Sequence, residues 1–460
     1  MKKIFILLFL LFFASYIHAQ NEGNVWYFGS QAGLDFSSGS PVAITDGLIN
    51  TAEGTATVCN TNGSILFYTD GITVWDKFHN IMPNGNFLAG GNSSTQSALI
   101  SYIPGSNIYY IFTVQEVSSI SNNLSYSIVD MSLNGGAGDV TVKNSVLISQ
   151  ASEKLNAIKN ASNTGMWVMT HGTLNNSFYG YFVNASGLDT VPVISNIGQV
   201  FGSIDDNVGQ LKFSPDGTKL AIAAWSSNFV ELFDFNTNTG ILSNNRLINV
   251  PSGSNGVYGL EFSPSNNFLY ANNISPGAIY QWNINSNSAV FINNSIQQIG
   301  GLVNLRGALQ LGPDGKIYHA KYNSTSLGVI NNPDQPGALC DFVEYAIYLG
   351  GKLSIIGLPN YIHTSFIPTA INSINEEIFL HVFPNPFTSN VTIEIKNQNW
   401  KQVSFAIRNV LGQTIFNKTE NNSGSTNPIN IDLRFLSKGM YFLEVQIDEE
   451  RVMRKMLKEL

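Results

Sequence analysis

Apolar and polar positions alternate in short runs along most of this chain, and many of the runs end in the same kind of pair. At seven places an apolar residue is followed at once by Asp or Asn, and the steps between these polar residues lie between 41 and 54 residues. The pairs are Leu34-Asp35, Trp75-Asp76, Val129-Asp130, Val183-Asn184, Phe233-Asp234, Trp282-Asn283 and Ile330-Asn331. Short alternating runs predict β-strands, and a repeat of this length with four strands per unit is typical of a β-propeller blade.

A second repeated signal predicts a hairpin inside each unit. The segment 213–220, with Pro215-Asp216-Gly217 at its centre, recurs as 262–269 and 311–318, and the prolines are 49 residues apart in both steps. Each copy has turn chemistry between two apolar strands. The Asp or Asn that ends the third strand can bond to the backbone two residues on and begin the next turn.

The two ends of the repeat array are incomplete in complementary ways. Residues 25–28 resemble a second strand with no first strand before them, and residues 357–363 resemble a first strand with nothing after it. We therefore expect the two ends to complete one blade together and close the ring. A solenoid would leave two uncapped ends, which makes it the less favoured reading. The predicted fold is all-β, a seven-bladed β-propeller followed by a small Ig-like β-sandwich.

The chain ends predict export and a second module. Residues 1–19 have a basic start, an apolar core and small residues before the end, as in a secretory signal peptide. The propeller is expected over residues 20–369, a polar linker over 370–378 and a separate module over 379–460. No later stretch approaches about 18 apolar residues, so no transmembrane segment is expected.

Composition limits the possible partners. Charged residues make up only 12% of the chain and the net charge is −8, which argues against a nucleic-acid partner because phosphates attract a positive surface. The two cysteines, Cys59 and Cys340, fall on different predicted blades. We therefore expect buried free thiols in preference to a disulfide, which needs Cα atoms within about 7 Å.

The last module resembles a known family. Its His-Val-Phe-Pro-Asn-Pro-Phe entry at 381–387 is followed in order by segments 407–413 and 436–441 and by the basic end 451–458. Together they are similar to the type A C-terminal sorting domain of type IX secretion cargo. The resemblance implies the type IX secretion machinery as a partner, and a protein secreted or attached to the outer-membrane surface after signal-peptide removal and C-terminal processing. The propeller also looks like an uncharacterised group that travels with such domains, through segments 24–29, 66–71 and 357–360.

The chain carries no local catalytic signature. It lacks Gly-x-Ser-x-Gly, His-Glu-x-x-His, Cys-x-x-Cys and a phosphate loop, and its histidines are scattered singly, so no catalytic residue, metal ligand or cofactor is expected. The best ligand-binding candidates precede the inner strands, where loops of a propeller ring one mouth of the channel. They are Glu53, Gln96, Glu153, Asp206, Tyr258, Arg306 and Asn360. Solvated loop residues are the alternative reading of each.

The predicted function follows from this fold and address. We expect an exported, non-enzymatic propeller that acts as a binding or scaffolding module for an unknown glycan or protein. The alternative is a hydrolase or lyase acting on polysaccharide through carboxylates at the mouth, such as Glu53 and Glu153. That alternative needs two or three acids and a His or Tyr to converge there. Fold alone does not choose between the two.

Overall fold

The computed structural model describes residues 21–117, 122–251, 255–275, 277–303, 305–362, 380–395, 402–409, 413–421, 429–447 and 450–459. The chain divides into two compact units, Met1–Phe366 and Ile367–Leu460, here the N-terminal and the C-terminal unit. The expected signal peptide (1–19) and linker (370–378) lie outside the described residues. The described residues are all-β, as predicted, apart from the short helices η1 (Asn21–Gly23), η2 (Asn134–Gly136), η3 (Ile204–Asn207), α1 (Ala289–Asn294) and η4 (Gly337–Cys340).

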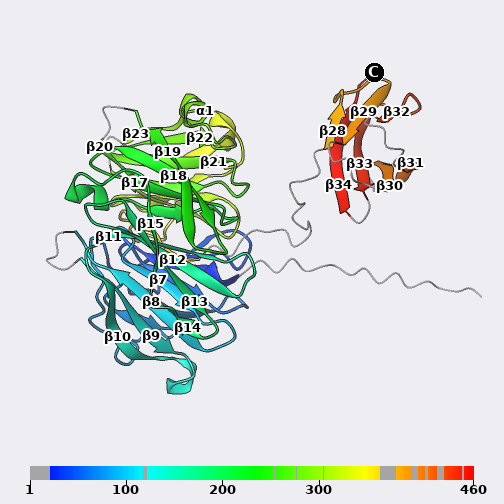
Figure 1. Cartoon of the computed structure of the whole chain (residues 1–460). Coiled ribbons are helices and arrows are strands. Elements are labelled where there is room, and N and C mark those ends of the chain that lie inside the picture. Colours follow the sequence, from blue (N-terminus) through cyan, green and yellow to red (C-terminus); the bar gives the residue numbers. More distant parts are fainter. Residues whose placement is uncertain are drawn as a thin grey trace, which may run out of the picture. The chain divides into compact units, whose positions relative to one another are not determined.

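The described part of the N-terminal unit forms seven antiparallel sheets (Figure 1). The first two contain β1 (Val25–Phe28), β2 (Ala32–Asp35) and β3 (Val42–Ile44), then β4 (Ala56–Cys59), β5 (Ile65–Thr69) and β6 (Val74–Asp76). The third contains β7 (Ala98–Tyr102), β8 (Ile108–Val114), β9 (Leu124–Asp130) and β10 (Asp139–Ile148). The fourth contains β11 (Ala151–Lys159), β12 (Gly165–Gly172), β13 (Ser177–Asn184), β14 (Gly187–Leu188) and β15 (Val193–Asn196).

The remaining three sheets have four strands each and follow chain order. The fifth contains β16 (Leu211–Phe213), β17 (Lys219–Ala224), β18 (Phe229–Asn236) and β19 (Ile241–Asn249). The sixth contains β20 (Asn255–Phe262), β21 (Phe268–Ser275), β22 (Gly277–Asn283) and β23 (Gln297–Val303). The seventh contains β24 (Arg306–Leu311), β25 (Ile317–Lys321), β26 (Ser326–Ile330) and β27 (Phe342–Tyr348).

The predicted hairpin turn joins β16 to β17. Ser214 N–H donates to the carbonyl of Lys219 at 2.9 Å, and Gly217 has a φ of 72°, which a residue with a side chain adopts only with strain. The hairpins at 262–269 and 311–318 pair in the same way, as β20 with β21 and β24 with β25. The Pro-Asp-Gly type pattern therefore marks real hairpins.

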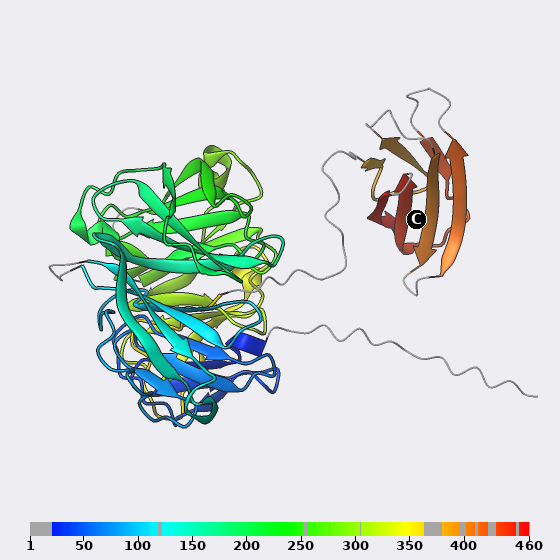
Figure 2. The same cartoon turned by 60° about the horizontal axis from the view of Figure 1, so that its bottom comes forward.

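The first strands of six sheets contact one another in sequence, from β4 through β7, β11, β16 and β20 to β24. The segment 353–361 closes this circle between β24 and β4. Ala308 N–H donates to the carbonyl of Ile356, and Asn360 N–H donates to the carbonyl of Thr55, both at 2.7 Å. In Figure 2 the late strands (yellow) lie beside the early ones (blue), although they are far apart in the sequence.

This closing segment differs in detail from the strand expected at 357–363. It forms an isolated parallel bridge, Pro359 with Thr55, and is no regular strand in its described part, which ends at residue 362. Pro359 has no N–H, so the segment cannot extend a continuous ladder. Side chains supply part of the contact with β1, because the rings of Trp26 and Tyr361 lie 5.9 Å apart.

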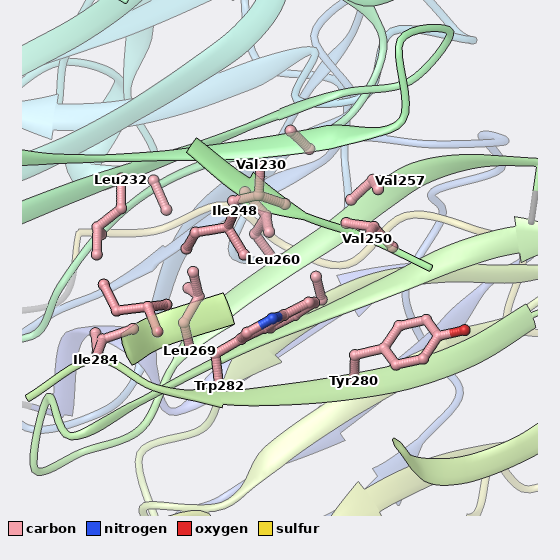
Figure 3. Close-up of a cluster of buried hydrophobic side chains, with 14 of the residues drawn as sticks. Val230, Leu232, Ile248, Val250, Val257, Leu260, Leu269, Tyr280, Trp282 and Ile284 are labelled. Atoms are coloured by element: carbon pink, nitrogen blue, oxygen red, sulfur yellow. The ribbon is translucent and has the colours of Figure 1, made fainter. Parts of the chain in front are cut away.

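Apolar side chains fill the space between neighbouring sheets. One cluster joins the fifth and sixth sheets, with Val230 and Ile248 facing Leu260, Leu269 and Trp282 (Figure 3). Successive side chains of a strand point to opposite faces, so cluster members two residues apart, such as Leu269 and Ala271, lie on one face. The apolar side chains buried between these two sheets form a close-packed core.

The C-terminal unit contains two antiparallel sheets. One has β28 (Leu380–Phe383), β29 (Asn390–Ile395) and β32 (Ile429–Asp432), and the other has β30 (Gln402–Asn409), β31 (Thr414–Asn421), β33 (Gly439–Ile447) and β34 (Glu450–Lys458). Val391 and Ile431 of the first sheet share a core with Phe405 and Leu443 of the second. The strands expected at 391–395 and 441–447 are confirmed within β29 and β33. The Ig-like topology stays a prediction.

Both cysteines are buried and free, as expected. Cys59 ends β4 and Cys340 ends η4. Burial raises the pKa of Cys59 to about 12 and that of Cys340 to about 11, so both are inert thiols at neutral pH.

Candidate functional site

The seven residues expected at the channel mouth fall into three groups. Glu53 precedes β4, Glu153 lies in β11, Asp206 lies in η3 before β16, and Tyr258 lies in β20. Gln96 and Asn360 join a polar layer among the inner strands, and Arg306 lies apart. All are buried, with Glu53 exposed most, at 5%. We call the group around Glu53, Glu153 and Tyr258 the ring-end site.

Glu153, in β11, is held by three donors at the ring-end site. The backbone N–H and the hydroxyl of Thr95 donate to Glu153 Oε2 at 2.9 and 2.8 Å, and Val117 N–H donates to Oε1 at 2.8 Å. Burial raises the pKa of Glu153, and these donors, with the neighbouring Lys154, act against the rise. The donors favour the charged form, so Glu153 is the candidate carboxylate of the site.

Glu53, in the loop before β4, is in the opposite situation. Its Oε2 is buried and has no hydrogen-bond partner among the described residues. Burial first, and the charge of Glu153 second, raise the pKa of Glu53 well above its ordinary value, although the Tyr258 hydroxyl acts to lower it. Desolvation and a negative neighbour both favour the neutral form of a carboxyl group, so Glu53 is the candidate acid of the site.

Two hydroxyl groups at the same place also lack partners. Tyr258 OH and Ser94 Oγ are buried and complete no hydrogen bond of normal geometry with the described residues. Tyr258 lies close enough to Glu53 for electrostatic coupling, and burial followed by Glu53 raises the pKa of the phenol. The carbonyl of Ser94 accepts Gly54 N–H at 3.0 Å, which places Ser94 beside the Glu53 loop. Buried polar groups are normally satisfied, so these atoms mark where a ligand hydroxyl would complete the hydrogen bonding.

Lys154 and Asp206 support the backbone around the ring-end site. Lys154 Nζ donates to the carbonyls of Val208 and Gly209 at 2.7 and 3.0 Å. Burial lowers the pKa of Lys154 to about 7, and the charges of Glu153 and Asp206 oppose that change. Asp206 accepts the backbone N–H of Ser227 at 2.7 Å. Both charged groups are therefore bonded to the protein itself.

Gln96 and Asn360 bond inner strands to one another. Gln96 Oε1 accepts the N–H groups of Leu155 and Leu211 at 3.1 and 2.8 Å. Asn360 Nδ2 donates to the carbonyl of Leu155 at 2.6 Å, and its Oδ1 accepts from Asn156 at 2.9 Å. These amides satisfy backbone groups that face the centre of the circle.

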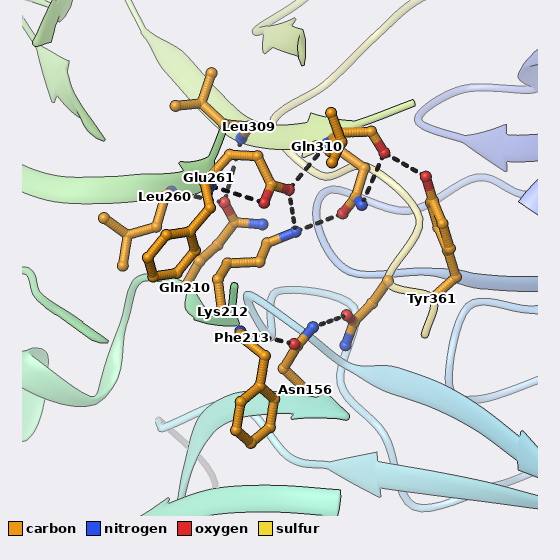
Figure 4. A network of polar contacts seen from close by, with 12 residues as sticks. Asn156, Gln210, Lys212, Phe213, Leu260, Glu261, Leu309, Gln310 and Tyr361 are labelled. Atoms are coloured by element: carbon orange, nitrogen blue, oxygen red, sulfur yellow. Dashed lines mark hydrogen bonds and ion pairs between the residues drawn. The ribbon is translucent and has the colours of Figure 1, made fainter. Parts of the chain in front are cut away.

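The same polar layer contains a fully buried ion pair (Figure 4). Lys212 Nζ lies 3.1 Å from Glu261 Oε2 and donates to Gln310 Oε1 at 2.5 Å. The carboxylate of Glu261 also accepts N–H groups of Phe262 and Leu311, both at 2.9 Å. The three side chains come from β16, β20 and β24, so the network ties three sheets together.

Arg306 has contacts of its own and does not join the ring-end site. Its guanidinium pairs with Glu344 of β27 at 2.7 Å and donates to the carbonyls of Gly277 and Gly301 at 2.7 and 2.8 Å. His319 Nδ1 lies 3.3 Å from Arg306 Nη1. Arg306 therefore forms an ion pair between the inner and outer strands of the seventh sheet. Its guanidinium N–H groups are directed at these protein partners and not at an anionic ligand.

Sequence reasoning missed Thr95, Lys154 and the pair Lys212–Glu261. A signal was present for the pair, because Lys212, Glu261 and Gln310 are 49 residues apart (261 − 212 and 310 − 261) and precede the aligned hairpins. When polar or charged residues occupy the same position in successive copies of an apolar strand, they indicate hydrogen bonds or ion pairs between the copies. Thr95 gives no such signal, since its role depends on which loop faces Glu153.

The C-terminal unit matches a family model. Residues 381–459 match the secretion system C-terminal sorting domain. The chain is therefore a protein that type IX secretion delivers to the cell surface or beyond it, as the resemblance implied. No helix among the described residues has the length and apolar character needed to cross a membrane.

No curated protein matches the chain, whereas many solved structures do. A putative 6-phosphogluconolactonase from Bacteroides uniformis is 11% identical, covering 71% of this chain and 98% of that one, with a TM-score of 0.45. The periplasmic gluconolactonase of Pseudomonas aeruginosa is 14% identical, covering 80% and 94%, with a TM-score of 0.37. A luciferin-regenerating enzyme is 11% identical, covering 59% and 83%, with a TM-score of 0.35.

These comparisons correct one expectation. The sequence predicted a protein that is not an enzyme, yet the similar structures include proteins named for enzymatic activities. The prediction assumed that missing local motifs exclude catalysis, whereas a site assembled from distant loops leaves no such motif. The likeness is too distant to transfer a particular reaction to this chain.

Proposed function

We propose that the N-terminal unit is a seven-bladed β-propeller that binds a neutral glycan at the ring-end site on the outside of the cell. Seven sheets in the described part of the N-terminal unit, and a closing segment between β24 and β4, support the ring. The sorting domain supplies the address, because extracellular and surface polysaccharides are within reach of an exported protein.

The observation that carries this proposal is the set of buried polar atoms without partners. Glu53 Oε2, Ser94 Oγ and Tyr258 OH gather where the inner strands begin. Together they offer a carboxylic acid donor and two hydroxyl groups, each of which both donates and accepts. Sugar hydroxyl groups have the same dual character, and a site built to bond them discriminates strongly against ligands that lack them.

Charge further narrows the ligand. The ring-end site combines Glu53 with Glu153, and its cation, Lys154, is bonded to backbone carbonyls. A uronic acid would bring a third carboxyl group into this buried place, where like charges repel strongly. We therefore expect neutral sugars to bind better than acidic ones.

The test is a glycan array probed with the purified full chain, carrying neutral and acidic oligosaccharides. Glu53→Ala and Tyr258→Phe should each weaken binding of the neutral glycan hits by at least about tenfold. Glu231→Gln is the matched control, because Glu231 is a buried carboxylate of β18 that accepts Gln199 N–H at 2.9 Å, away from this site. Unchanged affinity in both ring-end variants, or binding of proteins in place of glycans, would contradict the proposal.

A second candidate function, polysaccharide cleavage, is favoured by the protonation states of the two acids. Burial and the charge of Glu153 raise the pKa of Glu53 and favour its neutral form, whereas three hydrogen-bond donors favour the charged form of Glu153, and glycoside hydrolysis requires such a division of roles. Release of reducing sugar from the array hits, lost in both Glu53→Gln and Glu153→Gln, would establish this function. Binding without release would leave the ring-end site as a recognition site.

A further inference from the structure

A second group of side chains gathers around the hydroxyl of Tyr68 on the outer side of the first two sheets. Tyr68 OH accepts Leu48 N–H at 3.2 Å and lies 3.0 Å from His79 Nδ1. His79 Nε2 in turn lies 3.5 Å from Asp46 Oδ2, and Tyr27 OH donates to Asp46 Oδ1 at 3.0 Å. Five residues from two sheets and their loops thus form one connected chain of polar contacts.

The direction of the hydrogen bonds follows from the donors present. Tyr68 accepts from Leu48, so its own proton is available to His79 Nδ1, which leaves the Nε2 proton facing Asp46. Asp46 accepts the Tyr27 hydroxyl on one side and lies near His79 Nε2 on the other. Its side chain is nevertheless 60% exposed. The result is a carboxylate whose orientation is fixed by buried aromatic groups and whose outer face is open to solvent.

His79 occupies a backbone conformation that a histidine rarely adopts. Its φ is 64°, in the left-handed region, and the cost for a non-glycine residue is of order 1 kcal/mol or more. The turn around it is held by Asp76, whose Oδ1 accepts the N–H groups of Phe78 and Asn80 at 2.8 and 2.9 Å. Asn or Gly suits such a position better. The imidazole at this position bridges Tyr68 and Asp46.

Apolar surface adjoins this carboxylate. Phe78, next to His79 in the chain, is 65% exposed, and Leu48, two residues after Asp46, is 43% exposed. Lys77 Nζ lies 5.3 Å from the centre of the Phe78 ring, a cation–π contact that steadies the ring. Exposed apolar side chains on the two segments that carry His79 and Asp46, together with an oriented acceptor, match the two sides of a hexose, its C–H face and its hydroxyl edge.

We infer that Asp46, Leu48 and Phe78 form an outer site for one neutral hexose unit of a glycan. The site is separate from the ring-end site and does not rest on the function proposed for it. Asp46 accepts two sugar hydroxyl groups, and Phe78 and Leu48 cover the C–H face. An acidic sugar is disfavoured, because its carboxylate would face that of Asp46.

The experiment measures retention of the full chain on insoluble neutral polysaccharides, cellulose and chitin, and on soluble neutral glucans by affinity electrophoresis. Phe78→Ala and Asp46→Asn should each reduce retention by at least tenfold. Phe87→Ala is the matched control, because Phe87 is 80% exposed in the same long connection between β6 and β7 and takes no part in the network. Glu53→Ala tests the ring-end site in parallel and should leave retention through the outer site intact.

A further variant separates binding from folding. His79→Asn keeps a residue that tolerates a positive φ but removes the bridge to Asp46, so the melting temperature should stay equal or rise while retention falls. A purely structural His79 would lose stability without a specific loss of retention. Wild-type retention of Phe78→Ala, or no binding of the wild-type chain to any of these neutral polysaccharides, overturns the proposal.

Discussion

The buried pair Lys212–Glu261 offers a quantitative test of what ties the inner strands together. Both side chains are completely buried and their charged atoms lie 3.1 Å apart. Lys212→Met removes the cation but leaves the carboxyl group of Glu261 among three sheets. Removal of one partner of such a pair costs about 3–5 kcal/mol, because the remaining charge stays buried.

The structure refines that magnitude. Glu261 keeps the N–H groups of Phe262 and Leu311 as donors, so the cost of Lys212→Met should lie near the lower end, about 3 kcal/mol. For roughly 340 residues the unfolding entropy is about 0.7 kcal/mol/K, so losses of about 3–5 kcal/mol lower the melting temperature by about 4–7 °C. The double variant Lys212→Met with Glu261→Gln removes both charges and should recover about 2 kcal/mol of that loss.

Differential scanning calorimetry of the wild type, both single variants and the double variant closes a double-mutant cycle. The double variant recovers about 2 kcal/mol relative to Lys212→Met, and Glu261→Gln is itself destabilising, so the coupling between the two sites should exceed about 2 kcal/mol. Additive losses with coupling below about 0.5 kcal/mol would refute the reasoning and show that the two residues contribute independently.

Three further predictions concern packing, pH and redox state. Gly357→Ala places a Cβ 1.9 Å from the carbonyl oxygen of Glu53 and should cost about 1–3 kcal/mol or more, whereas Gly301→Ala meets no atom within 4 Å and should be nearly neutral by thermal unfolding. The pKa of Lys154 is lowered to about 7, so the unfolded chain binds more protons above that pH and stability should rise between pH 7 and about 10; Lys154→Met should flatten this slope in denaturant titrations. Dithiothreitol should leave the melting temperature unchanged, because Cys59 and Cys340 are free, and a drop would indicate a disulfide.

The pairs of apolar and Asp or Asn residues show how far local chemistry carries a prediction. Asp35, Asp76, Asp130, Asn184 and Asn283 each accept the backbone N–H two residues on, at 2.7–3.0 Å, as the sequence predicted. Asp234 instead pairs with Arg246 at 2.5 Å. Asn331 accepts from Lys316 at 3.0 Å. The hydrogen bond from Asp or Asn to the backbone of the turn needs only residues within the turn. A nearby cation, by contrast, is positioned by neighbouring strands, so the local sequence does not predict it.

The candidate site shows the same difference between what the local sequence predicts and what tertiary contacts decide. The repeat period predicted that Glu53, Glu153 and Tyr258 precede inner strands, but only Glu53 does so, whereas Glu153 lies in β11 and Tyr258 in β20. The period also placed Arg306 at an equivalent position, where the ion pair with Glu344 removes it from the group. Register decides which end of a strand a residue occupies, but the partner across the sheet decides where a long side chain goes.

The outer site lay beyond sequence reasoning for a further reason. Tyr27, Asp46, Tyr68 and His79 come from two sheets and two connections, and no spacing in the chain relates them. Only His79 carries a local mark, its positive φ, and that mark exists in the backbone alone. Backbone strain alone is a weak indicator of function, because a single change to Asn or Gly would remove it. A strained residue that also links a network of polar contacts is a stronger indicator. The variant His79→Asn makes that change directly, so the opposite responses of stability and retention test the indicator itself.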